Sequence, residues 1–304
     1  MTTTTQARPL PTTIPAYLAQ LRQALAGADP ALVQDALYDA EEYLRAELAE
    51  HSGKSEAEVI AAVAGSYGAP DEVAEIYRDT EVTVSRALRP PLPPRRRSWL
   101  GRFFGVAADS RTYGALFYML LSLVTGVFYF TWVVTGISLS AGLLILIIGV
   151  PLLVLFFGSV RVLSLVEGRV VETLLGMRMP RRPAHPGPRE GWLQRIGAMF
   201  SDVRTWSTLL YFMLMLPLGT LYFSVFITLL ALSLGLAASP LALLWPNDQL
   251  TLSLGTMDVT SPLAMLPICA TGILLLFLTL HLARGFGHVH GLLAKHLLVV
   301  SGKE

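Results

Sequence analysis

The sequence contains little cysteine and little charge. One cysteine, Cys269, occurs in 304 residues, which excludes an internal disulfide framework and any metal site built from several cysteines. Charged residues make up 15% of the chain, whereas an ordinary globular domain carries about 25%. Hydrophobic residues make up 53% and the mean hydropathy is +0.55. This composition excludes a soluble secreted scaffold and indicates an integral membrane protein.

Motifs for catalysis are also missing. The sequence has no phosphate loop, dinucleotide fingerprint, HExxH or GxSxG. We therefore predict no enzyme activity, no catalytic residue, no cofactor and no metal. Four histidines near the C-terminal end leave three alternatives open, namely membrane-edge side chains, a metal or haem site, and a pH-responsive element. They are His281, His288, His290 and His296.

The two signs of charge are segregated along the chain. Residues 15–80 hold 13 acids and four bases, a net charge of −9, and the remainder holds 19 bases and nine acids, a net charge of +10. Such asymmetry predicts two different environments. The first 15 residues have no apolar core, so we expect no cleavable signal peptide and a cytoplasmic acidic segment.

Long runs without charge predict four membrane spans. Residues 112–160, 205–247 and 259–281 contain no charged residue, and one span needs about 20 residues. The first run therefore holds two spans joined by a tight turn near Gly136–Gly142. The predicted spans are about 112–134, 142–164, 205–229 and 261–283. Their interiors lack ionisable residues, which disfavours an ion-coupled transporter or a proton relay. Glycines at 126, 142, 149, 219 and 272 suit close helix packing.

Arginine and lysine predict the orientation of these spans. They gather before the first span, between the second and third, and after the fourth. We therefore expect a protein of the bacterial inner membrane with both termini on the cytoplasmic side. The outer connections carry only Asp248 and Asp258. These two are our candidate outer sensing residues, for a cation or a lipid headgroup, with a plain polar lip as the alternative. Residues 230–260 are apolar but broken by glycine and proline, which favours a re-entrant or interfacial segment over a fifth span.

Residues 15–80 predict a small bundle of three or four helices. Asp29-Pro30 is typical of a helix start, and Ser55 with Glu58 forms a capping box. One helix in between carries an acidic face formed by Asp35, Asp39 and Glu42. This face is either a solvated surface or a docking face for a basic partner.

The same segment resembles the HAAS signalling domain of bacteria. The resemblance rests on Tyr17-Leu18, on Glu41-Glu42 and on the run Gly68-Ala69-Pro70-Asp71-Glu72. It implies a domain joined to membrane segments, with a PadR-like regulator as cytoplasmic partner and no direct contact with nucleic acid.

The membrane part contains an internal repeat. A shift of 93 residues aligns 99–130 with 192–223 at 13 of 32 identical positions, among them Trp, Asp, Arg and Gly. A shift of 123 aligns Gly149 with Gly272 and Arg161 with Arg284. Each copy comprises an interfacial helix and two spans in the same orientation, which predicts a parallel repeat.

Each copy of the repeat opens with aromatic residues beside arginine. Trp99 with Arg102 and Trp192 with Arg195 are candidate interfacial anchors at an anionic leaflet. A generic membrane anchor and a lipid-sensing or force-transmitting element both remain open for these two segments.

Residues 99–300 resemble the sensor domain of actinobacterial sensor histidine kinases. The resemblance rests on Tyr118, on Gly149-Val150-Pro151, on Glu167-Gly168-Arg169 and on His290-Gly291. The kinase parts themselves are missing from this sequence, so a sensor of this kind implies output through the N-terminal domain or a partner.

We therefore predict an all-α chain, with a small cytoplasmic bundle and a four-helix transmembrane domain built from a two-fold parallel repeat. The expected function is that of a non-catalytic sensor relaying an envelope or lipid cue. An accessory subunit of a transporter or complex, and a lipid-acting enzyme, are the alternatives. Membrane lipids, a cytoplasmic regulator and a second copy of the chain are the expected partners. The expected segments are 1–14 disordered, 15–80 acidic domain, 81–98 Pro/Arg-rich linker, 99–180 first repeat, 181–191 cytoplasmic linker and 192–304 second repeat.

Overall fold

The computed structural model is all-α apart from one short ladder. It describes residues 9–88, 98–143, 149–182, 197, 202–244, 253–254, 257–258 and 262–299. The chain divides into two compact units. Unit 1 comprises the described parts of Met1–Pro90, Arg178–Ser201 and Val299–Glu304, and unit 2 those of Pro91–Met177 and Asp202–Leu298.

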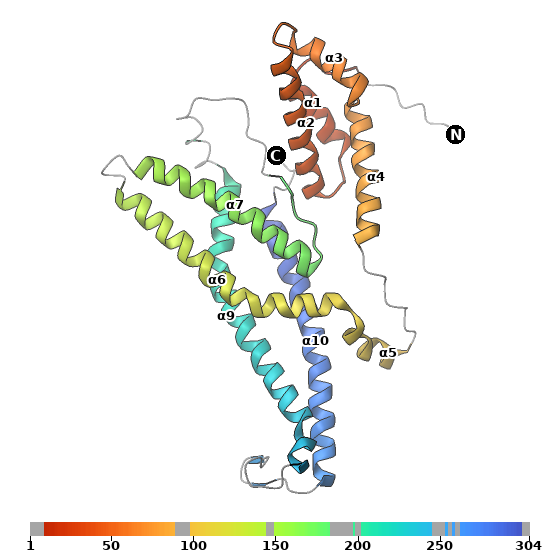
Figure 1. Cartoon of the computed structure of the whole chain (residues 1–304), viewed down its shortest axis with the longest axis vertical. Helices are drawn as coiled ribbons and strands as arrows, with labels where there is room; N and C mark the ends of the chain where they lie inside the picture. Colours follow the sequence, from red (N-terminus) through yellow and green to blue (C-terminus); the bar gives the residue numbers. More distant parts are fainter. Residues whose placement is uncertain are drawn as a thin grey trace. The chain divides into compact units, whose positions relative to one another are not determined.

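Unit 1 contains the four short helices that its capping residues predict. They are α1 (Ile14–Ala24), α2 (Pro30–Glu50), α3 (Glu56–Ser66) and α4 (Pro70–Leu88) (Figure 1). The Asp29 side chain accepts from the Ala31 amide at 2.9 Å and opens α2. The capping box of Ser55 and Glu58 is formed in full at the start of α3. Local side-chain chemistry therefore sets the helix boundaries of this unit.

The core of unit 1 is a single apolar cluster drawn from all four helices. Leu21, Leu44, Ile60 and Val73 belong to it, each at most 3% exposed. Tyr17 is fully buried, and its hydroxyl donates to the Gly68 carbonyl at 2.8 Å. Burial raises the pKa of Tyr17, which keeps this phenol a donor. Gly68 has φ of +112°, a conformation that a β-carbon would strain.

Unit 2 contains four helices that are long and apolar enough to cross a membrane. They are α6 (Ser110–Leu143), α7 (Gly149–Leu175), α9 (Val203–Ala237) and α10 (Pro262–Leu298). Shorter elements accompany them, namely α5 (Trp99–Phe104), η1 (Gly105–Ala108), η3 (Ser239–Leu244), β1 (Ser253–Leu254) and β2 (Met257–Asp258). The prediction of four apolar helices is confirmed.

The predicted span ends differ from the helix ends. Helix α6 continues to Leu143, so the turn expected near Gly136–Gly142 is wrong, because those residues are helical. Helices α7 and α10 extend 11 and 15 residues past the predicted ends at 164 and 283. The continuations are amphipathic, and a hydropathy window that counts only apolar residues misses them.

Helices α6 and α9 cross at glycines, and α9 and α10 run side by side (Figure 1). A β-carbon on Gly126 would overlap the backbone carbonyl of Met215, and one on Gly219 would overlap that of Ser122. The two backbones therefore touch, as small residues allow in membrane helices. Gly272 lies equally close to the backbone at Ala237, whereas Gly142 faces open space. The expected packing role is thus confirmed for Gly126, Gly219 and Gly272 and wrong for Gly142.

Candidate functional site

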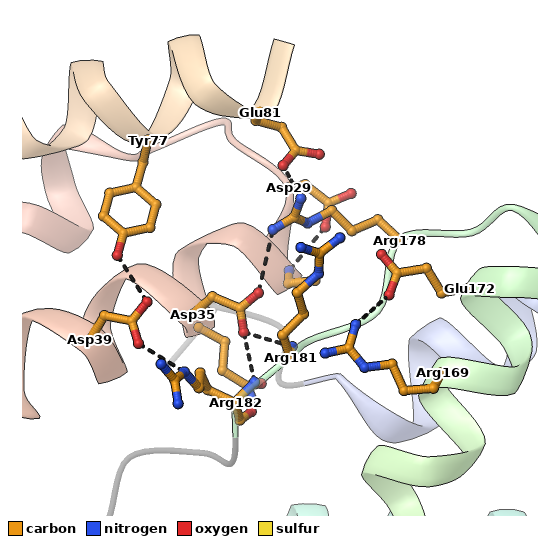
Figure 2. Close-up of polar contacts among 12 residues, drawn as sticks. Asp29, Asp35, Asp39, Tyr77, Glu81, Arg169, Glu172, Arg178, Arg181 and Arg182 are labelled. Carbon is orange, nitrogen blue, oxygen red and sulfur yellow. Dashed lines mark hydrogen bonds and ion pairs between the residues drawn. The ribbon is translucent and has the colours of Figure 1, made fainter. Parts of the chain in front are cut away.

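The acidic face predicted on α2 carries a segment of the chain's own arginines. Asp35 is only 6% exposed. Its Oδ1 accepts hydrogen bonds from the backbone amides of Arg181 at 2.7 Å and Arg182 at 2.9 Å, and its Oδ2 lies 3.3 Å from Nη2 of Arg178. Figure 2 shows the Asp35 carboxylate lying between these three residues. We call residues 178–182 the arginine segment.

Several further side chains of α2 and α4 hold the arginine segment. Asp39 places Oδ1 2.9 Å from Nε of Arg182, an ion pair without hydrogen-bond alignment, while its Oδ2 accepts from the Tyr77 hydroxyl at 3.0 Å. Glu81 of α4 pairs with Arg178. Gln34 donates from Nε2 to the Arg182 carbonyl at 2.6 Å. Helices α2 and α4 therefore contact both the backbone and the side chains of the arginine segment.

The ring of Tyr38 adds a cation–π contact, with the Arg182 guanidinium carbon 5.6 Å from the ring centroid. Glu42, the third predicted member of the docking face, is exposed. The acids that contact the arginine segment are therefore Asp35 and Asp39 of the predicted face and Glu81 of α4, and Glu42 stays a predicted docking residue.

Burial opposes the charges that meet on this face. The pKa of Asp35 is raised, because desolvation outweighs the hydrogen bonds from Arg181 and Arg182 and the attraction of Arg178. The pKa of Arg178 is lowered, again chiefly by desolvation. Both groups are thus shifted toward their neutral forms although they are paired. In a buried ion pair the cost of desolvation offsets much of the charge attraction.

A second polar cluster lies inside unit 2, and we call it the Tyr–Glu–His cluster. Glu167 of α7 is 0% exposed and accepts from three phenols, those of Tyr118 at 2.6 Å, Tyr211 at 3.0 Å and Tyr129 at 2.9 Å. His290 of α10 is also 0% exposed, with Nε2 2.8 Å from the Tyr118 oxygen and 3.1 Å from the Tyr211 oxygen. Its Nδ1 is buried without a hydrogen-bond partner.

The prediction of spans without ionisable residues concerned shorter segments, and the helices carry a buried carboxyl group and a buried imidazole beyond them. Glu167 and His290 lie in the continuations of α7 and α10 that the hydropathy pattern left out. The available signal was the repeat, since Tyr118 and Tyr211 are related by the shift of 93 residues and Glu167 and His290 by the shift of 123.

The other C-terminal histidines lie apart from this cluster. His281 places Nε2 3.0 Å from the Phe103 carbonyl and stacks on the Phe103 ring, while His288 and His296 are exposed. Cys269 directs its thiol toward the Ala237 carbonyl at 3.2 Å, a packing position. In the described ranges no three His, Cys, Asp or Glu side chains are grouped so as to hold a metal ion.

The structure describes only some of the residues predicted to lie in the outer connections and at the membrane interface. Asp258 lies in β2, paired in register with Ser253 of β1, and Asp248 is outside the described residues. Trp99 and Arg102 lie in α5, with Arg102 exposed. The second pair of predicted anchors, Trp192 and Arg195, is outside the described residues.

Four long apolar helices and a separate small helical unit define a multi-pass membrane protein with an appended helical domain. Residues 118–298 match the model of the family described as Putative sensor, and residues 16–76 match the HAAS model. The first match covers more than half of the chain, so the chain belongs to that sensor family. Both resemblances expected from the sequence are thereby confirmed. Neither the curated proteins nor the solved structures gave a match.

Proposed function

We propose that the chain is a non-catalytic sensor of the bacterial inner membrane, with both termini in the cytoplasm. It relays an envelope or lipid cue to a cytoplasmic partner that docks on the HAAS domain. The arginines that border the predicted spans support this orientation. A PadR-like regulator is the partner that the HAAS resemblance favours.

The observation that carries this proposal is the arginine segment on Asp35 and Asp39. The segment begins three residues after α7 ends at Leu175, and Gly176 provides the turn with φ of +70°. A change at the end of α7 therefore reaches the acidic face through a few covalent bonds. The segment occupies two of the residues that we expect a basic partner to use, so the partner and the segment compete.

The desolvation cost of the Asp35–Arg178 ion pair is compatible with competition between the arginine segment and a partner. The shifted pKa values of Asp35 and Arg178 indicate that their attraction does not fully offset desolvation. A partner that offers its own cations can replace the segment on the same face.

We further propose that unit 2 is a two-fold parallel repeat. Its contacts occur in equivalent pairs, which supports this origin. Asp109 pairs with Arg284 at 3.0 Å and Asp202 with Arg161 at 3.5 Å, so each copy's aspartate meets the other copy's arginine. The crossing at Gly126 and Gly219 is reciprocal in the same way.

Partner capture tests the proposal. The full-length protein is purified by affinity from its native membranes, as wild type and as the double variant R178A/R182A, and the co-purified proteins are identified. Removal of the competing arginines should raise recovery of a cytoplasmic regulator by about fivefold, the factor that corresponds to about 1 kcal/mol.

R169A is the matched control, because Arg169 pairs with Glu172, three residues along α7, at 2.9 Å. It should leave recovery at the wild-type level. Recovery of lipids alone from all three proteins would contradict a relay. Recovery of transport subunits would instead favour an accessory role.

A further inference from the structure

The hydrogen bonds of the Tyr–Glu–His cluster indicate its protonation state. A phenol has one hydrogen to donate, and the hydroxyls of Tyr118, Tyr129 and Tyr211 all lie within hydrogen-bond distance of Glu167 and can donate to it. An ionised carboxylate can accept all three of these bonds. The oxygens of Tyr118 and Tyr211 can then meet Nε2 of His290 only as acceptors, so the imidazole carries its hydrogen on Nε2.

This assignment leaves one open lone pair and one uncompensated charge. With a neutral imidazole the cluster has a net charge of −1, and Nδ1 of His290 is a buried acceptor without a donor. A buried charge without a counter-charge is costly. In the described part of unit 2, no lysine or arginine acts on Glu167, whose interactions are those with the three phenols.

Every helix around the cluster contributes a titratable group. Helix α6 contributes Tyr118 and Tyr129, α7 contributes Glu167, and α10 contributes His290. Helix α9 contributes Tyr211 and also Tyr222, whose ring lies edge-on to His290 with centroids 5.6 Å apart. The phenols are neutral donors, so Glu167 and His290 are the two groups of the cluster that can exchange a proton below about pH 8.

We propose that the Tyr–Glu–His cluster is a proton-binding site of unit 2. A proton from water adds to Nδ1 of His290, and the net charge of the cluster goes from −1 to zero. Tyr118 and Tyr211 then connect the imidazolium with the carboxylate. A proton is the ligand that suits this site, because Glu167 and His290 are both fully enclosed by side chains.

Proton binding also changes the packing of α10. The new N–H on Nδ1 has no acceptor within the cluster, and a buried donor without an acceptor is as costly as the open lone pair it replaces. Helix α10 must therefore shift against α6 and α9, or admit water, until Nδ1 gains a partner. This inference concerns unit 2 alone and does not depend on the relay proposed above.

A pH titration of the purified full-length protein tests the site. The near-ultraviolet circular dichroism reports the packing of the tyrosines and is followed between about pH 3 and pH 8, a range that covers the proton exchange of a buried histidine. We expect one reversible transition with the slope of a single proton in the wild type. E167Q and H290N should each abolish it, since one removes the charge and the other the acceptor.

The matched controls replace the same residue types nearby. H288N changes an exposed histidine two positions away, and E172Q changes the carboxylate that pairs with Arg169 on α7. Both should retain the transition. Far-ultraviolet dichroism identifies any variant that no longer folds. If both E167Q and H290N fail to fold, the titration of the wild type alone tests the proposal. A wild type without a single-proton transition, or a transition that persists in folded E167Q or H290N, would overturn the proposal.

Discussion

The sequence predicts the position of Asp35 on its helix but not its burial. The spacing of Asp35, Asp39 and Glu42 places all three on one helix face, and a helical pattern predicts that much. It does not predict that Asp35 is 6% exposed while Glu42 is exposed. The difference arises from backbone amides 146 and 147 residues away in sequence. No local pattern carries that information.

At this scale the stability should depend on the ionisation of Asp35. Its pKa is raised in the folded state above the ordinary value of 3.8, so the folded chain binds this proton more tightly than the unfolded chain. The free energy of unfolding should therefore fall as the pH rises from about 3.8 through the raised pKa. D35N has no such proton to lose, and its stability should decline less over the same interval. Thermal melts of both proteins at a series of pH values measure the difference, and parallel curves would contradict it.

At the scale of elements, caps and apolar runs predict most of the helices. Asp29 and Ser55 start helices as expected, because a capping bond is a local interaction. Helix ends in unit 2 are less predictable, since α7 and α10 continue as amphipathic helices past the point where hydropathy falls. Glu167 belongs to such a continuation, where tertiary hydrogen bonds, and not local composition, explain a buried carboxylate.

Because α6 and α9 are in close contact, alanine substitutions at two glycines of α9 should have unequal effects on stability. G219A places a β-carbon on the Ser122 carbonyl, so the helices must separate, and we expect a loss of about 1–3 kcal/mol. G235A lies on the same helix facing open space and should be neutral or slightly stabilising. Thermal melts of the purified variants provide the comparison. Equal melting temperatures for the two variants would show that the crossing is not tight.

At the scale of the whole molecule, the chain combines a membrane sensor unit with a HAAS unit. The sequence was sufficient to recognise both families and the four apolar helices. It was not sufficient for either polar cluster, because each joins residues that are far apart along the chain. The arginine segment had been assigned only to membrane orientation, and the structure places it on Asp35 as well.

Hydrogen exchange at the amides of Arg181 and Arg182 tests most directly whether the arginine segment occupies the acidic face. Both amides donate to Oδ1 of Asp35, and hydrogen bonds to a charged group contribute about 1.5–3 kcal/mol each. We expect protection of both amides in the wild type, a loss of about tenfold or more in D35A, and wild-type protection in E42A, which removes an exposed acid of the same helix. Unprotected amides in the wild type, or equal protection in D35A and E42A, would contradict an arginine segment held by Asp35.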